Sequence, residues 1–305
     1  MPINMVVDCD PGHDDAVALM VAHEHANVLG ITTVCGNAPL EDTSRNALAL
    51  AELADWATPV HSGAATPLNG KARHATHVHG ETGLGGAALP APRTSLASRD
   101  AAGFLLEISK RVNDLWVVAI GPLTNLALAL EKDPGFPARI AGISIMGGSA
   151  AAGNVTRVAE FNIWADPEAA AVVFRAGARL RMCGLNLTTQ LQSHDGLIHR
   201  LAGRGAVPDL VTRLFTFMHD RMENLVGERR AALHDPCAVL ALTHPHLIRF
   251  EPRAVDVELT GEWTRGMTVV DERSLRRRDP PNTEVAYGID ATSAMEVVLE
   301  SALGC

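Results

Sequence analysis

The sequence feature that most constrains the fold is the N-terminal stretch MPINMVVDCDPGHDD. Residues 3–7 form an apolar run broken only by Asn4, which is typical of a strand in a parallel sheet covered on both faces. Pro11 and Gly12 predict a turn, and the following AVALMVAHEHA predicts a helix. A buried strand, a tight turn and a helix in this order indicate the first unit of an α/β fold.

Four aspartates surround this turn, namely Asp8, Asp10, Asp14 and Asp15. Asp8 and Asp10 are two residues apart, so both should point to the same side of the sheet. Like charges in a half-buried place repel one another and must bind protons or a cation. Carboxylate oxygens suit a hard divalent metal, which we expect at the carboxyl end of the first strand. The alternative is that Asp14 only caps the helix while the other aspartates are solvated.

Composition restricts the class of protein. The chain has 305 residues, 47% of them hydrophobic, with one Tyr and seven Phe, so the core should be mostly aliphatic. A net charge of −9 argues against nucleic acid as a partner, and we place the basic cluster Arg276–Arg278 on a surface loop. Five cysteines, an odd number, favour a reducing compartment. Because no signal peptide or transmembrane segment is evident, we expect a cytoplasmic protein.

Strand and helix patterns alternate along the chain, which predicts a largely parallel sheet with right-handed crossovers. We expect strands at 3–7, 29–37, 59–63, 115–120 and 138–148, a strand followed by a turn at 179–188, and further strands near 255–261, 266–271 and 284–290. We expect helices at 14–26, 41–56, 99–112, 121–132, 165–177, 206–226, 234–245 and 291–303. The long segment 63–98, rich in His and Gly, should be a functional loop. With no linker visible, we expect one Rossmann-like α/β domain over residues 1–305, with helices flanking the central sheet.

Ligands of open α/β sheets bind beyond the carboxyl ends of the strands. This rule gathers polar residues that are far apart in the sequence: Asp8 and Asp10, Asn37, Ile120, the loop with Asn154, Glu160 and Asn162, and His234 with Asp235. Carboxylates and carboxamides can bind vicinal hydroxyls, and Ca²⁺ accepts hydroxyls as ligands. The residues alone therefore predict metal-assisted chemistry on a sugar-like substrate.

Seven motifs resemble those of the nucleoside hydrolases, the Ca²⁺-dependent enzymes that cleave the N-glycosidic bond of ribonucleosides. In chain order they are DCDPGHDDAVAL, TTVCGN, HGETGLGG, GPLTN, MGG, the stretch N-x-x-x-x-x-E-F-N from Asn154 to Asn162, and HDPCAV. The resemblance covers nearly the whole chain. It implies a nucleoside hydrolase fold, a role in nucleoside salvage or catabolism, and a homodimer or homotetramer.

The resemblance also implies a role for each matching residue. Asp10, Asp15 and Asp235 look like side-chain ligands of Ca²⁺, joined by the main-chain carbonyl of Ile120, and Asp8 looks like a residue that orients them. Asp10 further resembles the general base acting on the metal-bound water, and His234 the acid that protonates the departing base. The residues matching substrate-binding positions are Asp14, Asn37, His79, Met146, Asn154, Glu160 and Asn162.

The reaction is consistent with these residue types. Cleavage of an N-glycosidic bond builds positive charge on the ribose in an oxocarbenium-like transition state, which nearby carboxylates stabilise. A carboxylate base is needed because Ca²⁺ acidifies water only mildly, and a histidine can donate a proton near neutral pH. Two alternatives remain: a non-catalytic nucleoside- or ribose-binding protein, and a Mg²⁺-dependent phosphohydrolase with a D-x-D motif.

Several departures from the family pattern leave the base preference open. The segment before His234 lacks the tyrosine that many members place against the base, and we hypothesise that Arg229 or Arg230 replaces it. Asn186 stands where many members carry Asp. A small zinc site made by His74, His77 and His79 is a further alternative.

Overall fold

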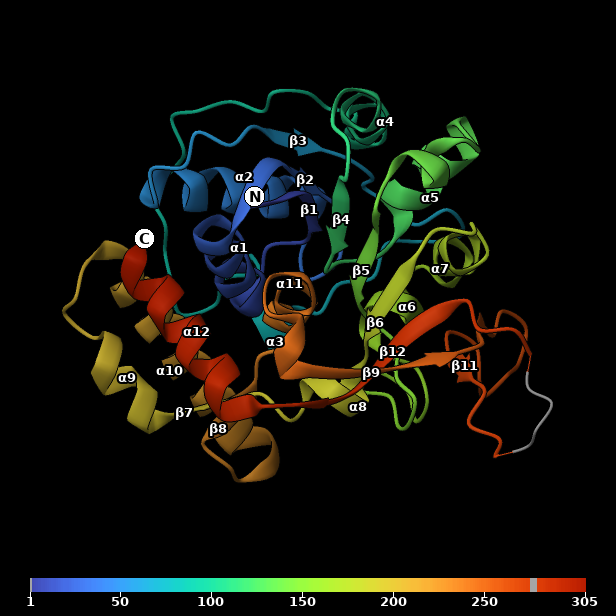
Figure 1. The fold of residues 1–305 in the computed structure, drawn as a ribbon. Helices are drawn as coiled ribbons and strands as arrows, with labels where there is room; N and C mark the ends of the chain where they lie inside the picture. The colour runs from blue at the N-terminus through green and yellow to red at the C-terminus, as the bar shows by residue number, and fades with distance from the viewer. Residues whose placement is uncertain (1, 275–278) are drawn as a thin grey trace.

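The computed structural model describes residues 2–274 and 279–305, so the predicted Arg276–Arg278 loop lies outside the described residues. At its centre is an eight-stranded sheet in the order β3-β2-β1-β4-β5-β6-β12-β9 (Figure 1). Its neighbouring strands pair in parallel except at one edge, where β9 runs antiparallel to β12. The strands are β1 (Ile3–Cys9), β2 (Ala26–Thr33), β3 (Val60–Ser62), β4 (Trp116–Ala119), β5 (Gly142–Met146), β6 (Leu180–Cys183), β9 (Ile248–Arg253) and β12 (Thr283–Ile289).

Helices cover both faces of the sheet and bury two apolar clusters (Figure 1). One cluster includes side chains of α1 (His13–His25), α2 (Leu40–Leu53), α10 (Ala206–Val226), α11 (Pro236–Thr243) and α12 (Ala291–Gly304). The other includes α4 (Ala101–Arg111), α5 (Thr124–Lys132) and α7 (Pro167–Phe174). These observations confirm the predicted α/β class with a largely parallel sheet between two helical layers.

Short elements complete the described part of the chain. Two antiparallel ribbons lie apart from the main sheet, one made by β7 (Gln192–His194) and β8 (Arg230–Ala232), the other by β10 (Val255–Val257) and β11 (Thr268–Val270). The short α-helices are α3 (Thr76–His79), α6 (Phe161–Ala165), α8 (Leu185–Thr188) and α9 (Asp195–Leu201), and 3₁₀ turns span Phe136–Arg139 and Pro245–Leu247. Among the described residues, no helix combines the length and the apolar character needed to cross a membrane.

Some boundaries differ from the sequence prediction. The strand predicted at 29–37 ends at Thr33, so Asn37 follows the strand rather than ending it. The strands expected at 255–261 and 266–271 form the separate β10–β11 ribbon rather than joining the main sheet. Strand β9 was not predicted because it contains Pro252 and several charged residues, a composition that suits only an edge strand.

The strand order places a topological switch at β1. The chain leaves β1 toward β2 and β3 on one side and then crosses back to β4, which pairs with the other side of β1. Helices following the two halves therefore diverge, and a crevice opens beyond the carboxyl ends of β1 and β4. Asp10 follows β1 at this point and Ile120 follows β4.

A buried polar network joins the strands just behind this crevice. The Asn125 side chain donates to Asp8 Oδ1 at 2.7 Å and to the Thr33 carbonyl at 3.0 Å, and its Oδ1 accepts from the Ala64 amide at 2.8 Å. The Thr32 hydroxyl also donates to Asp8 Oδ1, at 2.6 Å. Asp8 and Asn125 are both fully buried. Asp8 thus braces β1 against β2 and α5 through Oδ1, whereas its Oδ2 is buried without a hydrogen-bond partner among the described residues.

We expect Asn125→Leu to lower the free energy of unfolding by about 3 kcal/mol, because an apolar side chain of similar size leaves several buried polar groups without partners. Denaturant unfolding of the purified protein measures this loss. Asn27→Ala is the matched control, because Asn27 is exposed and donates only to Asn4 among the described side chains. Equal losses in the two variants would contradict a bracing role for Asn125.

Candidate active site

A cavity of about 590 Å³ occupies the crevice at the carboxyl edge of the sheet. Most of the residues predicted for the site line it: Asp14, Asn37, His79, Ile120, Met146, Asn154, Glu160, Asn162, His234 and Asp235. Asp10 and Asp15 are fully buried and lie beneath this lining. The residues that the strand-end rule predicts therefore meet at one cavity, whereas Asp8 belongs to the bracing network described above.

The turn after β1 is fixed by Asp15 rather than by Asp14. Asp15 is the third residue of α1, and its carboxylate reaches back to accept the Gly12 amide at 2.9 Å and the Asp10 amide at 3.1 Å. A carboxylate in the first turn of a helix satisfies free N–H groups and interacts favourably with the helix dipole. Asp14 instead accepts the His234 amide at 3.1 Å, so the interpretation of Asp14 as a simple helix cap is wrong.

Three carboxylates meet at the floor of the cavity. One oxygen each of Asp14, Asp15 and Asp235 lies within 4.8 Å of the others, and all three residues are buried. Burial, followed by the charge of Asp14, raises the pKa of Asp15 to about 7. Burial and the charges of the neighbouring aspartates also raise the pKa of Asp235 well above its usual range. The protein alone therefore provides too little positive charge nearby to favour the ionised forms of Asp15 and Asp235.

Asp10 adds a fourth buried carboxylate beside this trio. Its Oδ2 accepts the Asn37 amide at 2.6 Å, whereas its Oδ1 is buried and finds no hydrogen-bond partner among the described residues. The backbone approaches both oxygens so closely that only glycine fits. A Cβ at Gly36 would lie 2.0 Å from Oδ2, and a Cβ at Gly121 would lie 2.6 Å from Oδ1. Burial and the charge of Asp15 raise the pKa of Asp10 well above its usual range.

This set of donors fits a hard cation. Every group in it is an oxygen, and an ion would balance the buried charges while giving Asp10 Oδ1 a partner. The Ile120 carbonyl, which accepts from Asn162 at 2.9 Å, lines the same cavity. The aspartate cluster could thus bind a metal. Among the described residues it is the only group of at least three His, Cys, Asp or Glu side chains with this spacing, so His74, His77 and His79 form no comparable site.

A polar wall stands beside the aspartates, at the ends of β4 and β5. The Asn162 amide donates to the Ile120 carbonyl and, at 3.0 Å, to the Met146 carbonyl. Glu160 caps α6 and accepts the amides of Gly148 and Asn162, each at 2.9 Å. Burial raises the pKa of Glu160 to about 7, although these amide hydrogen bonds oppose the shift.

Two histidines enter the cavity from different segments. His234 Nδ1 lies 2.7 Å from the Thr188 hydroxyl, which leaves its Nε2 for a ligand. Burial lowers the pKa of His234, and the charge of Asp14 opposes this. His79 Nδ1 lies 3.2 Å from His13 Nδ1, whose ring in turn meets the Gly85 carbonyl through Nε2 at 3.0 Å. Burial lowers the pKa of His79 to about 3 and that of His13 to about 4, so this pair is neutral.

The sequence alone did not point to the residues that hold these side chains in position. Thr188, which orients His234, follows β6 at the same sheet edge, so the strand-end rule could have found it. Asn186 donates to the Ala286 carbonyl at 2.8 Å and accepts the Ala150 amide at 3.1 Å, and an Asp there could not make the first bond. The Arg229 guanidinium pairs with carboxylates outside the cavity, whereas Arg230 lines the cavity and pairs with Glu228. The hypothesis of a base contact thus loses support at Arg229 and remains open at Arg230.

Comparison with known proteins gives consistent similarities over the whole chain. The family model described as inosine-uridine preferring nucleoside hydrolase matches residues 5–296. The pyrimidine-specific ribonucleoside hydrolase RihA of Shewanella sp. (strain MR-4) is 40% identical over 97% of this chain and 95% of its own. Among solved structures, the purine-preferring ribonucleoside hydrolase from Gardnerella vaginalis superimposes with a TM-score of 0.93 at 28% identity, covering 99% of this chain and 98% of its own. The plant nucleoside hydrolase PpNRh1 reaches 0.93 at 29% identity, with full coverage of both chains.

We expect added Ca²⁺ to raise the thermal unfolding midpoint, because an ion that binds only the folded state stabilises it by about 2.7 kcal/mol at a hundredfold excess over Kd. Differential scanning calorimetry with Ca²⁺ and with EDTA measures the shift. Asp15→Asn should remove the calcium-dependent part, whereas Asp55→Asn, a change at an exposed carboxylate, should leave it intact. If Ca²⁺ raises the unfolding midpoint of Asp15→Asn as much as that of the wild-type protein, the ion binds elsewhere.

Proposed function

The chain belongs to the inosine-uridine preferring nucleoside hydrolase family, and from this premise we propose that its buried aspartates and His234 together hydrolyse ribonucleosides to ribose and free base. Membership makes the protein a ribonucleoside hydrolase, an N-glycosyl hydrolase. The observation that supports this assignment of roles best is Asp10 Oδ1, a buried oxygen without a partner among the described residues, beside three further carboxylates.

We assign the metal to Asp10, Asp15, Asp235 and the carbonyl of Ile120, and we propose Ca²⁺ because all of these donors are oxygens. When bound, Ca²⁺ would lower the pKa of water and orient ribose hydroxyls. Asp14 stands with Asp15 and Asp235 in the described cluster. We propose that Asp14 binds the ribose. Of the three aspartates it is the one that accepts the backbone amide of His234, and it also lines the cavity.

Asp10 is the proposed general base. The Asn37 amide donates to Oδ2, and the absence of side chains at Gly36 and Gly121 leaves space for the carboxylate. Oδ1 has no hydrogen-bond partner among the described residues, so we propose that it contacts the ion and takes the proton from the attacking water. Without an ion, burial and the charge of Asp15 raise the pKa of Asp10. A bound cation would favour the ionised carboxylate, which is the form that a general base needs.

The polar wall suits the ribose. Asp14, Asn37, Asn154, Glu160 and Asn162 are the proposed partners of its hydroxyls, with Met146 beneath the ring. As the glycosidic bond breaks, positive charge develops on the sugar, and the surrounding carboxylates stabilise it more in the transition state than in the ground state. His79 is kept neutral by its burial and is therefore a proposed polar contact rather than a cation.

His234 is the proposed acid for the departing base. The Thr188 hydroxyl holds its Nδ1, which directs Nε2 toward the cavity. The nearby carboxylate of Asp14 favours the protonated ring and partly offsets the effect of burial. A protonated base is a far better leaving group than an anionic one, so a positioned imidazolium contributes to the rate.

We propose that pyrimidine ribonucleosides are the preferred substrates. The support is the 40% identity to the pyrimidine-specific relative, which exceeds the 28% identity to the purine-preferring structure. The D-x-D phosphohydrolase and the non-catalytic binding protein are set aside by the family assignment. A single domain, a homodimer or homotetramer and a cytoplasmic location stay proposals, which single-transition unfolding, light scattering and cell fractionation would test.

We expect the protein to release reducing sugar from uridine and cytidine faster than from inosine, adenosine and guanosine. EDTA should abolish release and excess Ca²⁺ should restore it. Asp10→Asn should lower kcat by about 10²–10⁴, the usual contribution of a positioned general base. Asp55→Asn is the control for the loss of a carboxylate. If Asp10→Asn releases sugar from every nucleoside at the wild-type rate, Asp10 is not the general base.

We expect His234→Ala to lower kcat for uridine by roughly 10²-fold while changing turnover of 4-nitrophenyl β-D-riboside little, because nitrophenolate leaves without protonation. Steady-state kinetics with both substrates give the comparison. Equal losses on the two substrates would mean that His234 positions the ribose or the metal ligands instead of protonating the base.

A further inference from the structure

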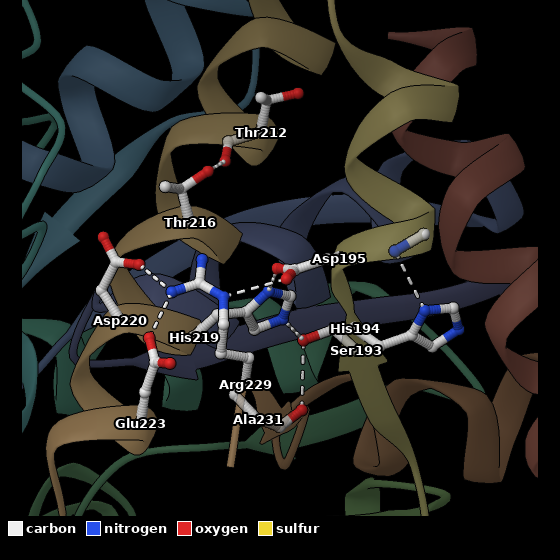
Figure 2. A network of polar contacts seen from close by, with 11 residues as sticks. Ser193, His194, Asp195, Thr212, Thr216, His219, Asp220, Glu223, Arg229 and Ala231 are labelled. Atoms are coloured by element: carbon white, nitrogen blue, oxygen red, sulfur yellow. Dashed lines mark hydrogen bonds and ion pairs between the residues drawn. The ribbon is translucent and has the colours of Figure 1, made fainter. Parts of the chain in front are cut away.

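A second polar network lies outside the cavity, between α9, α10 and the β7–β8 ribbon. The Ser193 hydroxyl lies 3.0 Å from His219 Nε2, and His219 Nδ1 lies 2.9 Å from Asp195 Oδ1. Figure 2 shows His219 between the other two side chains, each from a different element. The order serine, histidine, aspartate is that of a nucleophilic triad.

Access excludes a nucleophilic role. Ser193 and His219 have no exposed surface, and neither lines the cavity. The Ser193 hydroxyl also lies 3.1 Å from the Ala231 carbonyl, its partner residue across the ribbon. A buried hydroxyl with two close partners cannot reach a substrate, so the network connects the elements that carry it rather than acting on a ligand.

Arg229 extends the network to the surface. Its guanidinium contacts Asp195 at 2.9 Å, Asp220 at 2.6 Å and Glu223 at 2.7 Å (Figure 2). Asp195 thus accepts from His219 with one oxygen and from Arg229 with the other, and these bonds, that of Arg229 first, lower its pKa. The connection between α10 and β8 is therefore held to the start of α9.

The elements held in this way form one wall of the cavity. From α10 the side chains of Met218, Met222 and Leu225 line it, at a spacing that puts them on one face of the helix. His219 and Glu223 lie on another face of the same helix and belong to the network. The connection to β8 and β8 itself add Glu228, Arg230 and Ala231 to the lining. We call these six residues the base wall.

The base wall and the ribose site line the same cavity but are carried by different parts of the fold. Asp10, Asp14 and Asp15 follow β1, and the polar wall follows β4 and β5, all strands of the main sheet. His234 and Asp235 follow β8 at the start of α11, and the contacts of His234 to Asp14 and Thr188 tie them to the ribose site. The β7–β8 ribbon is not part of that sheet, so the orientation of the base wall depends on side-chain contacts rather than on a continuous strand ladder. With the sugar at the aspartates, the methionines of the wall are left to pack on the base.

We propose that Ser193, His219, Asp195 and Arg229 form a clamp of positioning residues, which sets the base wall and thereby the affinity and selectivity for the base. This inference rests on the proposed function. The clamp touches no substrate, and its effect is to keep α10 from rotating and β8 from shifting against the cavity. Loosening it should weaken contacts to the base while leaving the chemistry at the ribose unchanged.

The test compares Ser193→Ala, Asp195→Asn and Arg229→Gln with the wild-type protein. We expect each variant to raise KM for uridine about five- to tenfold, as expected when roughly 1 kcal/mol of positioning is lost, with kcat changed less than about twofold. The ratio of kcat/KM between uridine and inosine should move toward one. Inhibition by D-ribose, which reports the aspartate end alone, should keep its inhibition constant.

Two further variants separate positioning from general loss of stability. Ser193→Thr keeps the hydroxyl and should restore the wild-type KM and base ratio. Arg200→Gln removes the exposed ion pair between Arg200 and Glu296, which also attaches α9 to its surroundings but involves no residue of the base wall. It should lower stability without moving either kinetic quantity. Arg229→Gln changes a partly exposed residue, so it tests the clamp even if the buried variants fail to fold.

Unchanged KM and base ratio in folded Arg229→Gln and Ser193→Ala would overturn the clamp, as would a parallel rise in the D-ribose inhibition constant. Failure of the proposed function looks different, because the wild-type protein itself would then release no ribose. In that case calorimetric binding of uridine and D-ribose to the same variants decides the matter. Weaker uridine binding with unchanged ribose binding would still support the clamp, and equal changes would refute it.

Discussion

The main constraint on the candidate site is the mutual repulsion among its buried carboxylates, which the rest of the structure must offset. Asp10, Asp14, Asp15 and Asp235 converge in one place where burial already disfavours charge. Hydrogen bonds from the backbone at Gly12 and Asn37 offset only part of this cost. The fold therefore holds an arrangement that protons or a cation must balance, and the all-oxygen donor set could bind a metal.

The sheet makes this arrangement possible. At the switch point the residues after β1 and β4 face an open crevice, while Asp8 and Asn125 behind them bind the strands through buried hydrogen bonds. Asp10, Asp14 and Asp15 thus follow a central strand of the main sheet. The base wall is different, since α10 and the β7–β8 ribbon reach the cavity from outside the main sheet. Under the proposed function, a ribose site on the main sheet and a separately supported base wall would let base selectivity change with little effect on the reacting groups.

Much of the fold and of the site could be predicted from local sequence. Strand β1, helix α10 and the acidic turn follow from apolar runs, helical periodicity and Pro-Gly punctuation, all of which are short-range signals. The strand-end rule placed residues as distant as Asn37 and Asp235 at one cavity. The strands β7, β8 and β9 were not predicted, because strands that are short or at an edge of a sheet carry little apolar pattern of their own.

The sequence by itself determined the class of fold, the edge of the sheet that carries the site and the chemical type of its ligands, because period, turn residues and carboxylate spacing are properties of the local chain. Only the tertiary structure decided which carboxylate does what. It made Asp15 the helix cap, sent Asp8 into the brace and left Asp10 with a free oxygen. It also turned Arg229 away from the cavity into a network with Ser193 and His219, since contacts between residues far apart in the chain have no local signal.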